Sequence, residues 1–131
     1  MRPLLWVGLA LLGLQVVCGC GGAGGVWGID RELVGAWRQT DLTEDGFPTF
    51  FIGKTMQFRG DGTWRSDSAD GGWSLGGYQT RPGRLNYWID ASDYPNNVGH
   101  NYTFGYAVMS DPMTISGHMY GHYYVAYFGR L

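Results

Sequence analysis

The sequence predicts an all-β fold, an antiparallel meander of about eight short strands that closes into a β-barrel. From residue 33 onward no long stretch has helical periodicity, and aromatic and β-branched residues alternate with polar ones. Glycine, aspartate, proline and asparagine interrupt these segments at regular spacing, as expected for turns. A meander of this kind leaves two unpaired edges, and closing into a barrel removes them.

The clearest element is a hairpin over residues 55–66. The segment 55–59 and the segment 63–66 flank Gly60-Asp61-Gly62, a tight turn suited to positive φ. Alternation places Met56, Phe58 and Trp64 on the core side, while Gln57, Arg59 and Arg65 face water.

The other expected strands flank this hairpin. Residues 33–40 form an opening strand, and residues 48–52 form a short one. Residues 72–78 and 84–90 pair across Arg81-Pro82-Gly83, and a long loop covers 91–100. Residues 102–109, 113–117 and 122–128 complete the set, with Ser110-Asp111-Pro112 as a turn.

The N-terminal stretch differs from the rest of the chain. Arg2 gives a short positive region, and residues 4–17 are apolar except for Gln15. This run is shorter than the ~20 residues of a membrane-spanning helix and has the length of a signal-peptide core. Residues 1–19 are therefore interpreted as a signal peptide.

The end of this stretch, Val17-Cys18-Gly19-Cys20, resembles the lipobox of bacterial lipoproteins. That resemblance implies that Cys20 carries the lipid and that the protein is anchored in the cell envelope, at the outer membrane or the periplasmic face. Residues 20–28 then form a lipidated glycine-rich linker, and residues 29–131 form the barrel domain. The alternative is an ordinary signal peptide, cleaved nearby, and a secreted protein.

Charge and cysteine content narrow the possible partners. Without Arg2, eight basic residues face 11 acidic ones, a net charge of −3, and Lys54 is the only lysine. No basic run exists, so nucleic acid is not an expected partner. Both cysteines, Cys18 and Cys20, precede the domain, so no disulfide is expected within it.

The start of the domain resembles the lipocalin-like, or calycin, barrels. Residues 30–37 read Asp-Arg-Glu-Leu-Val-Gly-Ala-Trp, similar to the short helical turn and Gly-x-Trp strand that open those domains. The resemblance implies structural roles for Gly35 and Trp37, and for Arg130 packed over Trp37 at the closed end. The hairpin also resembles the Phe-x-x-Asp-Gly-Thr-aromatic hairpin of small bacterial members. This chain is shorter than a full lipocalin and lacks its usual disulfide.

No catalytic residues, cofactor or metal site are expected. The domain has no cysteine nucleophile and no Gly-x-Ser-x-Gly motif, and its paired carboxylates fall in expected loops. His118 and His122 would share a strand face, but Gly117 and Gly121 suggest a bend between them. A structural or catalytic metal would also require a third or fourth ligand.

The aromatic content of six Trp, nine Tyr and six Phe leaves two functions open. In the first, the barrel is a non-enzymatic binding module for a small apolar ligand, with Tyr102, Tyr106 and Tyr123 as candidate contacts. In the second, the aromatic residues fill a solid core, and the barrel is a structural or protein-interaction module such as an inhibitor or assembly factor. The segment 116–120, Ser-Gly-His-Met-Tyr, resembles the Ser-Gly-x-x-Tyr motif of lysozyme-inhibitor lipoproteins. The size of any cavity separates the two functions.

Overall fold

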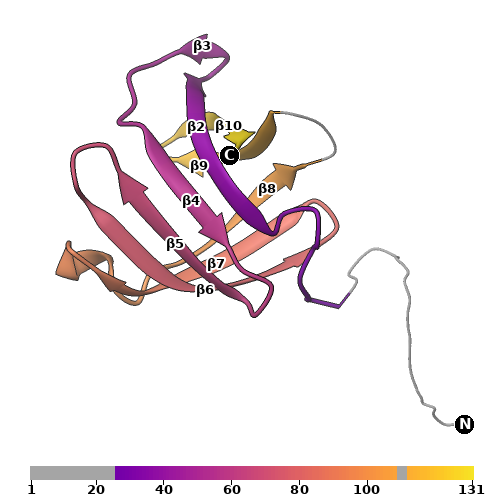
Figure 1. Ribbon diagram of the computed structural model, residues 1–131. Coiled ribbons are helices and arrows are strands. Elements are labelled where there is room, and N and C mark those ends of the chain that lie inside the picture. The colour runs from indigo at the N-terminus through magenta and orange to yellow at the C-terminus, as the bar shows by residue number, and fades with distance from the viewer. Residues whose placement is uncertain (1–25, 109–111) are drawn as a thin grey trace, which may run out of the picture.

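The computed structural model describes residues 26–108 and 112–131 as one all-β unit (Figure 1). The predicted signal peptide, Cys20 and most of the expected linker lie outside the described residues. The strands are β2 (Gly35–Glu44), β3 (Phe47–Pro48), β4 (Lys54–Phe58), β5 (Thr63–Ser68), β6 (Trp73–Arg81), β7 (Arg84–Ser92), β8 (Asn101–Ala107), β9 (Met113–Met119) and β10 (His122–Arg130). Within the described residues, no helix is long and apolar enough to cross a bilayer.

The strands form a closed antiparallel barrel, which confirms the predicted fold class. Each strand from β4 to β10 pairs with its sequence neighbour, and β10 returns to pair with β2 from Arg130↔Trp37 to Tyr124↔Glu44. Eight strands therefore close the ring, and the two-residue β3 adds a short edge beside β2. This architecture is compatible with a lipocalin-like barrel.

The two ends of the barrel follow from the up-and-down order of the strands. One end holds the start of β2, the end of β10 and the β4–β5 and β6–β7 turns, and we call it the closed end. The opposite end holds the β2–β3 turn, the loop of residues 49–53 and the β9–β10 turn, and we call it the mouth. Figure 1 shows β3 at the mouth and the start of β2 at the other end.

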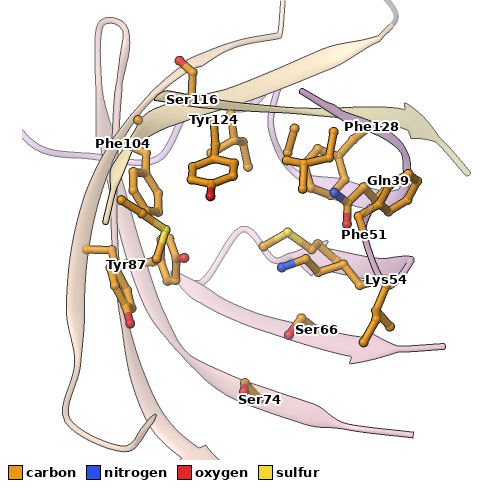
Figure 2. Close-up of a pocket in the computed structure, with 18 of the residues that line it drawn as sticks. Gln39, Phe51, Lys54, Ser66, Ser74, Tyr87, Phe104, Ser116, Tyr124 and Phe128 are labelled. Atoms are coloured by element: carbon orange, nitrogen blue, oxygen red, sulfur yellow. The ribbon is translucent and has the colours of Figure 1, made fainter. Parts of the chain in front are cut away.

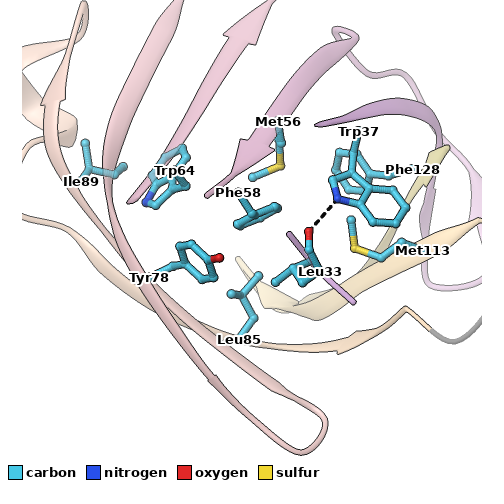
Figure 3. Close-up of a cluster of buried hydrophobic side chains, with 10 residues drawn as sticks. All are labelled: Leu33, Trp37, Met56, Phe58, Trp64, Tyr78, Leu85, Ile89, Met113 and Phe128. Atoms are coloured by element: carbon cyan, nitrogen blue, oxygen red, sulfur yellow. Dashed lines mark hydrogen bonds between the residues drawn. The ribbon is translucent and has the colours of Figure 1, made fainter. Parts of the chain in front are cut away.

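The hydrophobic core fills the half of the barrel next to the closed end (Figure 3). The predicted inward residues of the hairpin are buried, with Met56 at 6%, Phe58 at 1% and Trp64 at 2% exposure. They pack with residues from the other strands and from the N-terminal turn, namely Leu33, Trp37, Tyr78, Leu85, Ile89, Met113 and Phe128. Burial of the Tyr78 ring raises the pKa of its hydroxyl to about 12, and that hydroxyl donates to the Arg59 carbonyl at 2.7 Å.

Arg130 and Trp37 lie together at the closed end. The guanidinium carbon of Arg130 is 4.0 Å from the centre of the Trp37 ring, and its two terminal nitrogens donate to the carbonyls of Val34 and Glu32. The indole Nε1 of Trp37 donates to the Leu33 carbonyl at 2.9 Å. The last strand thus ties the N-terminal turn to the first strand.

Gly35 gives this cluster its space. Its φ is +142°, and a Cβ built there would lie 2.6 Å from Nη1 of Arg130. Gly35 therefore has a structural role, as the resemblance implies, because it allows the close approach of the guanidinium from the other end of the chain.

The N-terminal segment also pairs at the closed end. Gly28 and Thr80 exchange two backbone hydrogen bonds of 2.7 Å each, and the Asp30 N–H donates to the Thr80 hydroxyl. Tyr106 donates its hydroxyl to Asp30 Oδ2 at 2.7 Å. The chain is thus bonded to the barrel wall from Gly28 onward, one residue before the expected domain boundary.

Several strand limits differ from the sequence prediction. The strand expected over 48–52 is replaced by the two-residue β3 at Phe47–Pro48, since Pro48 has no N–H and only the Thr49 N–H continues the bonding to β2. The opening strand runs on to Glu44 instead of ending at residue 40. The loop expected from residue 91 begins only after Ser92 and contains the 3₁₀ turn η1 (Pro95–Asn97).

A bulge explains how β2 extends past residue 40. Its pairing with β10 shifts between Phe128↔Gln39 and Tyr127↔Asp41, which leaves Thr40 without a partner. Thr40 and Asp41 are both exposed, and Leu42 then faces the interior again. Gln39 and Leu42 therefore both point into the barrel although they are three residues apart.

Candidate functional site: a cavity at the barrel mouth

The barrel is hollow in the half next to the mouth. A cavity of about 500 Å³ lies above the core and is open at the mouth. Its wall includes residues from all eight barrel strands, from the loop 49–53, from η1 and from the β9–β10 turn. Figure 2 shows the side chains that converge on it. Small apolar binding sites have volumes of roughly 300–1,000 Å³, so the space suits a small organic ligand.

One wall of the cavity is a cluster of packed aromatic rings from β7 and β8. The Tyr87 ring lies 5.4 Å from that of Tyr102 and 5.9 Å from that of Phe104, and the Tyr102 and Phe104 rings stack at 5.7 Å. Trp64 meets Tyr87 edge to face at 5.1 Å at the base of this wall. Burial raises the pKa of Tyr87, so its hydroxyl stays neutral. This wall offers apolar contact area with no charge.

Gly117 makes room for that wall. A Cβ at Gly117 would lie 2.4 Å from Cδ1 of Phe104, so the close approach of the ring depends on glycine at this position. Gly117 lies within the regular strand β9 and does not bend it. The turn that separates His118 from His122 is instead made by Tyr120 and Gly121, with φ of 53° and 81°.

The opposite wall, formed by β2 and β4, carries an amine and an amide. Lys54 extends from the start of β4 into the cavity, and the amide of Gln39 points inward from β2 (Figure 2). Burial lowers the pKa of the Lys54 amine. Gln39 Oε1 is buried and has no hydrogen-bond partner among the described residues. Lys54 is the only charged residue among the described residues that line the cavity.

Of the three tyrosines expected to contact a ligand, only Tyr102 lies at the cavity. Tyr106 points the same way from β8 but lies deeper, packed on the core and bonded to Asp30. Tyr123 is 40% exposed and contacts His118 on the outside of the barrel, with ring centres 5.0 Å apart. Neither Tyr106 nor Tyr123 lines the cavity.

The alternation of side chains along β10 explains why Tyr123 lies on the outside of the barrel. The residues of β10 that line the cavity are Tyr124, Ala126 and Phe128, one position out of phase with Tyr123, Val125 and Tyr127. Both phases of this strand are rich in aromatic and apolar side chains, so the sequence pattern does not separate inside from outside. The preceding hairpin fixes the phase, because His118↔Tyr123 and Gly117↔Tyr124 are register pairs.

His122, Asp45 and Glu44 meet at the rim of the mouth. Nδ1 of His122 lies 2.7 Å from Asp45 Oδ2 and 3.4 Å from Glu44 Oε2, and potential metal-ligating atoms of the three residues lie within 4.8 Å of one another. Asp45 also accepts the Tyr123 N–H at 2.9 Å. This hydrogen bond lowers the pKa of Asp45, and Asp45 in turn raises the pKa of His122. The cluster holds the β2–β3 turn against the β9–β10 turn, and His118 is not one of its three residues.

Exposed apolar side chains surround the mouth. Phe47 is 74% exposed, Phe50 is 85% exposed and Tyr120 is 90% exposed. Tyr120 also lines the cavity, as does the neighbouring Ile52. The opening of the cavity is therefore surrounded by an apolar rim.

Comparison of the chain with family models, curated proteins and solved structures finds no match.

Proposed function

We propose that this protein is a lipocalin-like lipoprotein of the cell envelope that binds a small apolar ligand in its barrel without catalysis. The cavity of about 500 Å³ with its aromatic wall is the observation that carries this proposal. A barrel with a solid interior would instead favour a structural or protein-interaction role. Here only the half next to the closed end is packed, and the other half is hollow.

The apolar lining of the cavity supports binding through burial of apolar ligand surface. Transfer of apolar surface from water contributes roughly 25 cal/mol per Å², and a preformed cavity reduces the cost of ordering the protein. The packed rings of Tyr87, Tyr102 and Phe104 are positioned by strand pairing between β7 and β8, so this wall exists before a ligand binds.

A dye titration tests this proposal. Nile red, a neutral apolar dye, should bind with increased fluorescence, and decanol should displace it. Ala126 faces the cavity, so Ala126→Phe should fill part of it and weaken dye binding by about tenfold or more, which is about 1.4 kcal/mol. Ala107 is exposed on β8, so Ala107→Phe is the matched control and should bind as the wild type does.

Equal weakening by the two variants, or no dye binding by the wild type, would contradict the proposal. Native mass spectrometry of protein extracted from envelopes adds an independent check, because a bound ligand appears as a discrete added mass.

A second function is supported by the apolar rim. Phe47 and Phe50 are exposed without lining the cavity, and such residues mark surfaces that contact other proteins. A protein-interaction role becomes the better explanation if the wild type binds neither Nile red nor decanol.

A further inference from the structure

Lys54 is positioned inside the cavity by strand alternation. It lies two residues before Met56 and four before Phe58, both of which are buried inward residues of β4. Its side chain therefore points to the interior of the barrel, as Figure 2 shows. A lysine normally stays at the surface, and this is the only lysine of the chain.

The Lys54 amine has no acidic partner among the described residues. The cavity lining contains no aspartate or glutamate, and the described residues provide no ion-pair or hydrogen-bond partner for the Lys54 amine. Glu44 and Asp45, the acids at the rim, contact His122 instead. Lys54 is half-buried, and this loss of solvation without a counter-charge lowers the pKa of its amine.

A second unsatisfied polar group lies on the same wall. The register pairs Trp37↔Met56 and Arg38↔Thr55 bring the next residues along, Gln39 and Lys54, to neighbouring positions on β2 and β4. Gln39 Oε1 is buried without a partner among the described residues. Gln39 Oε1 can only accept a hydrogen bond, so the Lys54 amine is the group on this wall that can pair with an anion, whereas the facing wall is aromatic.

We propose that the ligand is an amphipathic carboxylate, such as a fatty acid, whose carboxylate pairs with the Lys54 amine and whose hydrocarbon chain lies against Tyr87, Tyr102 and Phe104. This inference rests on the proposed binding function and specifies its ligand class. One cation and no acid in the lining match a ligand with one negative charge, and the cavity supplies the low-dielectric surroundings in which such a pair is strong. A cationic ligand would meet an uncompensated like charge.

The test compares decanoate with decanol, which have the same chain length but differ in head-group charge, in Nile red displacement at neutral pH. In the wild type, decanoate should bind about ten- to a hundredfold more tightly than decanol, the range of a charge-assisted hydrogen bond. Lys54→Met should remove this preference by weakening decanoate, while decanol binding is kept. Arg38 is exposed on the adjacent strand, so Arg38→Met removes a charge outside the cavity and should keep the preference.

The outcomes separate the two proposals. If decanol binds as tightly as decanoate, or if Lys54→Met keeps the preference, the cavity binds apolar ligands but the carboxylate inference is wrong. If neither ligand binds, both the inference and the proposed function are wrong. The wild-type comparison needs no variant, so it decides the point even if Lys54→Met does not fold.

Discussion

Replacing Trp37 with alanine should lower the unfolding free energy of the barrel strongly, because this ring supports the closed end. The ring is 2% exposed, so Trp37→Ala creates a large cavity and should cost about 3–5 kcal/mol of unfolding free energy. Two specific contacts are lost as well. They are the hydrogen bond to the Leu33 carbonyl, worth about 0.5–1.5 kcal/mol, and the cation–π contact with Arg130, worth about 0.5–2 kcal/mol.

A double-mutant cycle isolates the contact between the two ends of the domain. Arg130→Met removes the guanidinium but keeps an apolar stem, and the cycle with Trp37→Ala should give a coupling energy of about 0.5–2 kcal/mol. Urea unfolding followed by fluorescence and by circular dichroism supplies the free energies, and coincident curves show that the barrel unfolds as one unit.

Two results would refute this reasoning. A loss below about 1 kcal/mol for Trp37→Ala would show that the ring is not the support that its burial indicates. A coupling energy of about zero would show that the stacking of Arg130 on Trp37 adds nothing beyond the separate contacts of each residue.

Three further predictions concern other parts of the chain. Gly35→Ala places a methyl group against the guanidinium at a strained φ and should cost about 1–3 kcal/mol in urea unfolding, whereas Gly53→Ala, in open space, should change stability by less than about 0.5 kcal/mol. An NMR titration should show the pKa of His122 above its ordinary 6.5, and Asp45→Asn should return it toward that value. The His122–Asp45 pair should then add stability that is lost as pH rises through the raised pKa of His122, or falls through the lowered pKa of Asp45, and an unchanged His122 pKa in Asp45→Asn would contradict this. Cys20→Ser should abolish labelling of cells with a palmitate analogue and release the protein from membranes, and unchanged labelling would count against lipidation.

The closed barrel was predictable because its strongest signals are local. The hairpin over residues 55–66 has clear alternation and a glycine-rich turn, and its inward residues Met56, Phe58 and Trp64 are buried as predicted. The closure of the ring was inferred from the need to remove sheet edges, and the β10–β2 pairing confirms it.

The cavity wall was harder to predict, for two physical reasons. In β10 both faces are apolar, so alternation alone does not show which residues point into the barrel. The hairpin register with β9 determines this. In β2 the bulge at Thr40 changes the phase within one strand. Lys54 was detectable, because the alternation that places Met56 and Phe58 inside also places residue 54 inside. A lysine among inward-facing positions was therefore the sequence signal for this polar group in the cavity.

The attachment of the N-terminal segment at the closed end determines how the barrel would be oriented on a membrane. If Cys20 is the anchor, the chain from Cys20 to Val26 spans at most about 20 Å, which is close to the height of a barrel with tilted strands. The floor of the barrel then lies toward the bilayer, and its opening faces the aqueous compartment. To turn that opening to the lipid, the tether would have to stretch along the whole barrel wall. If the cavity binds a ligand, this orientation favours exchange through water or through a docked carrier over lateral entry from the membrane that holds the protein.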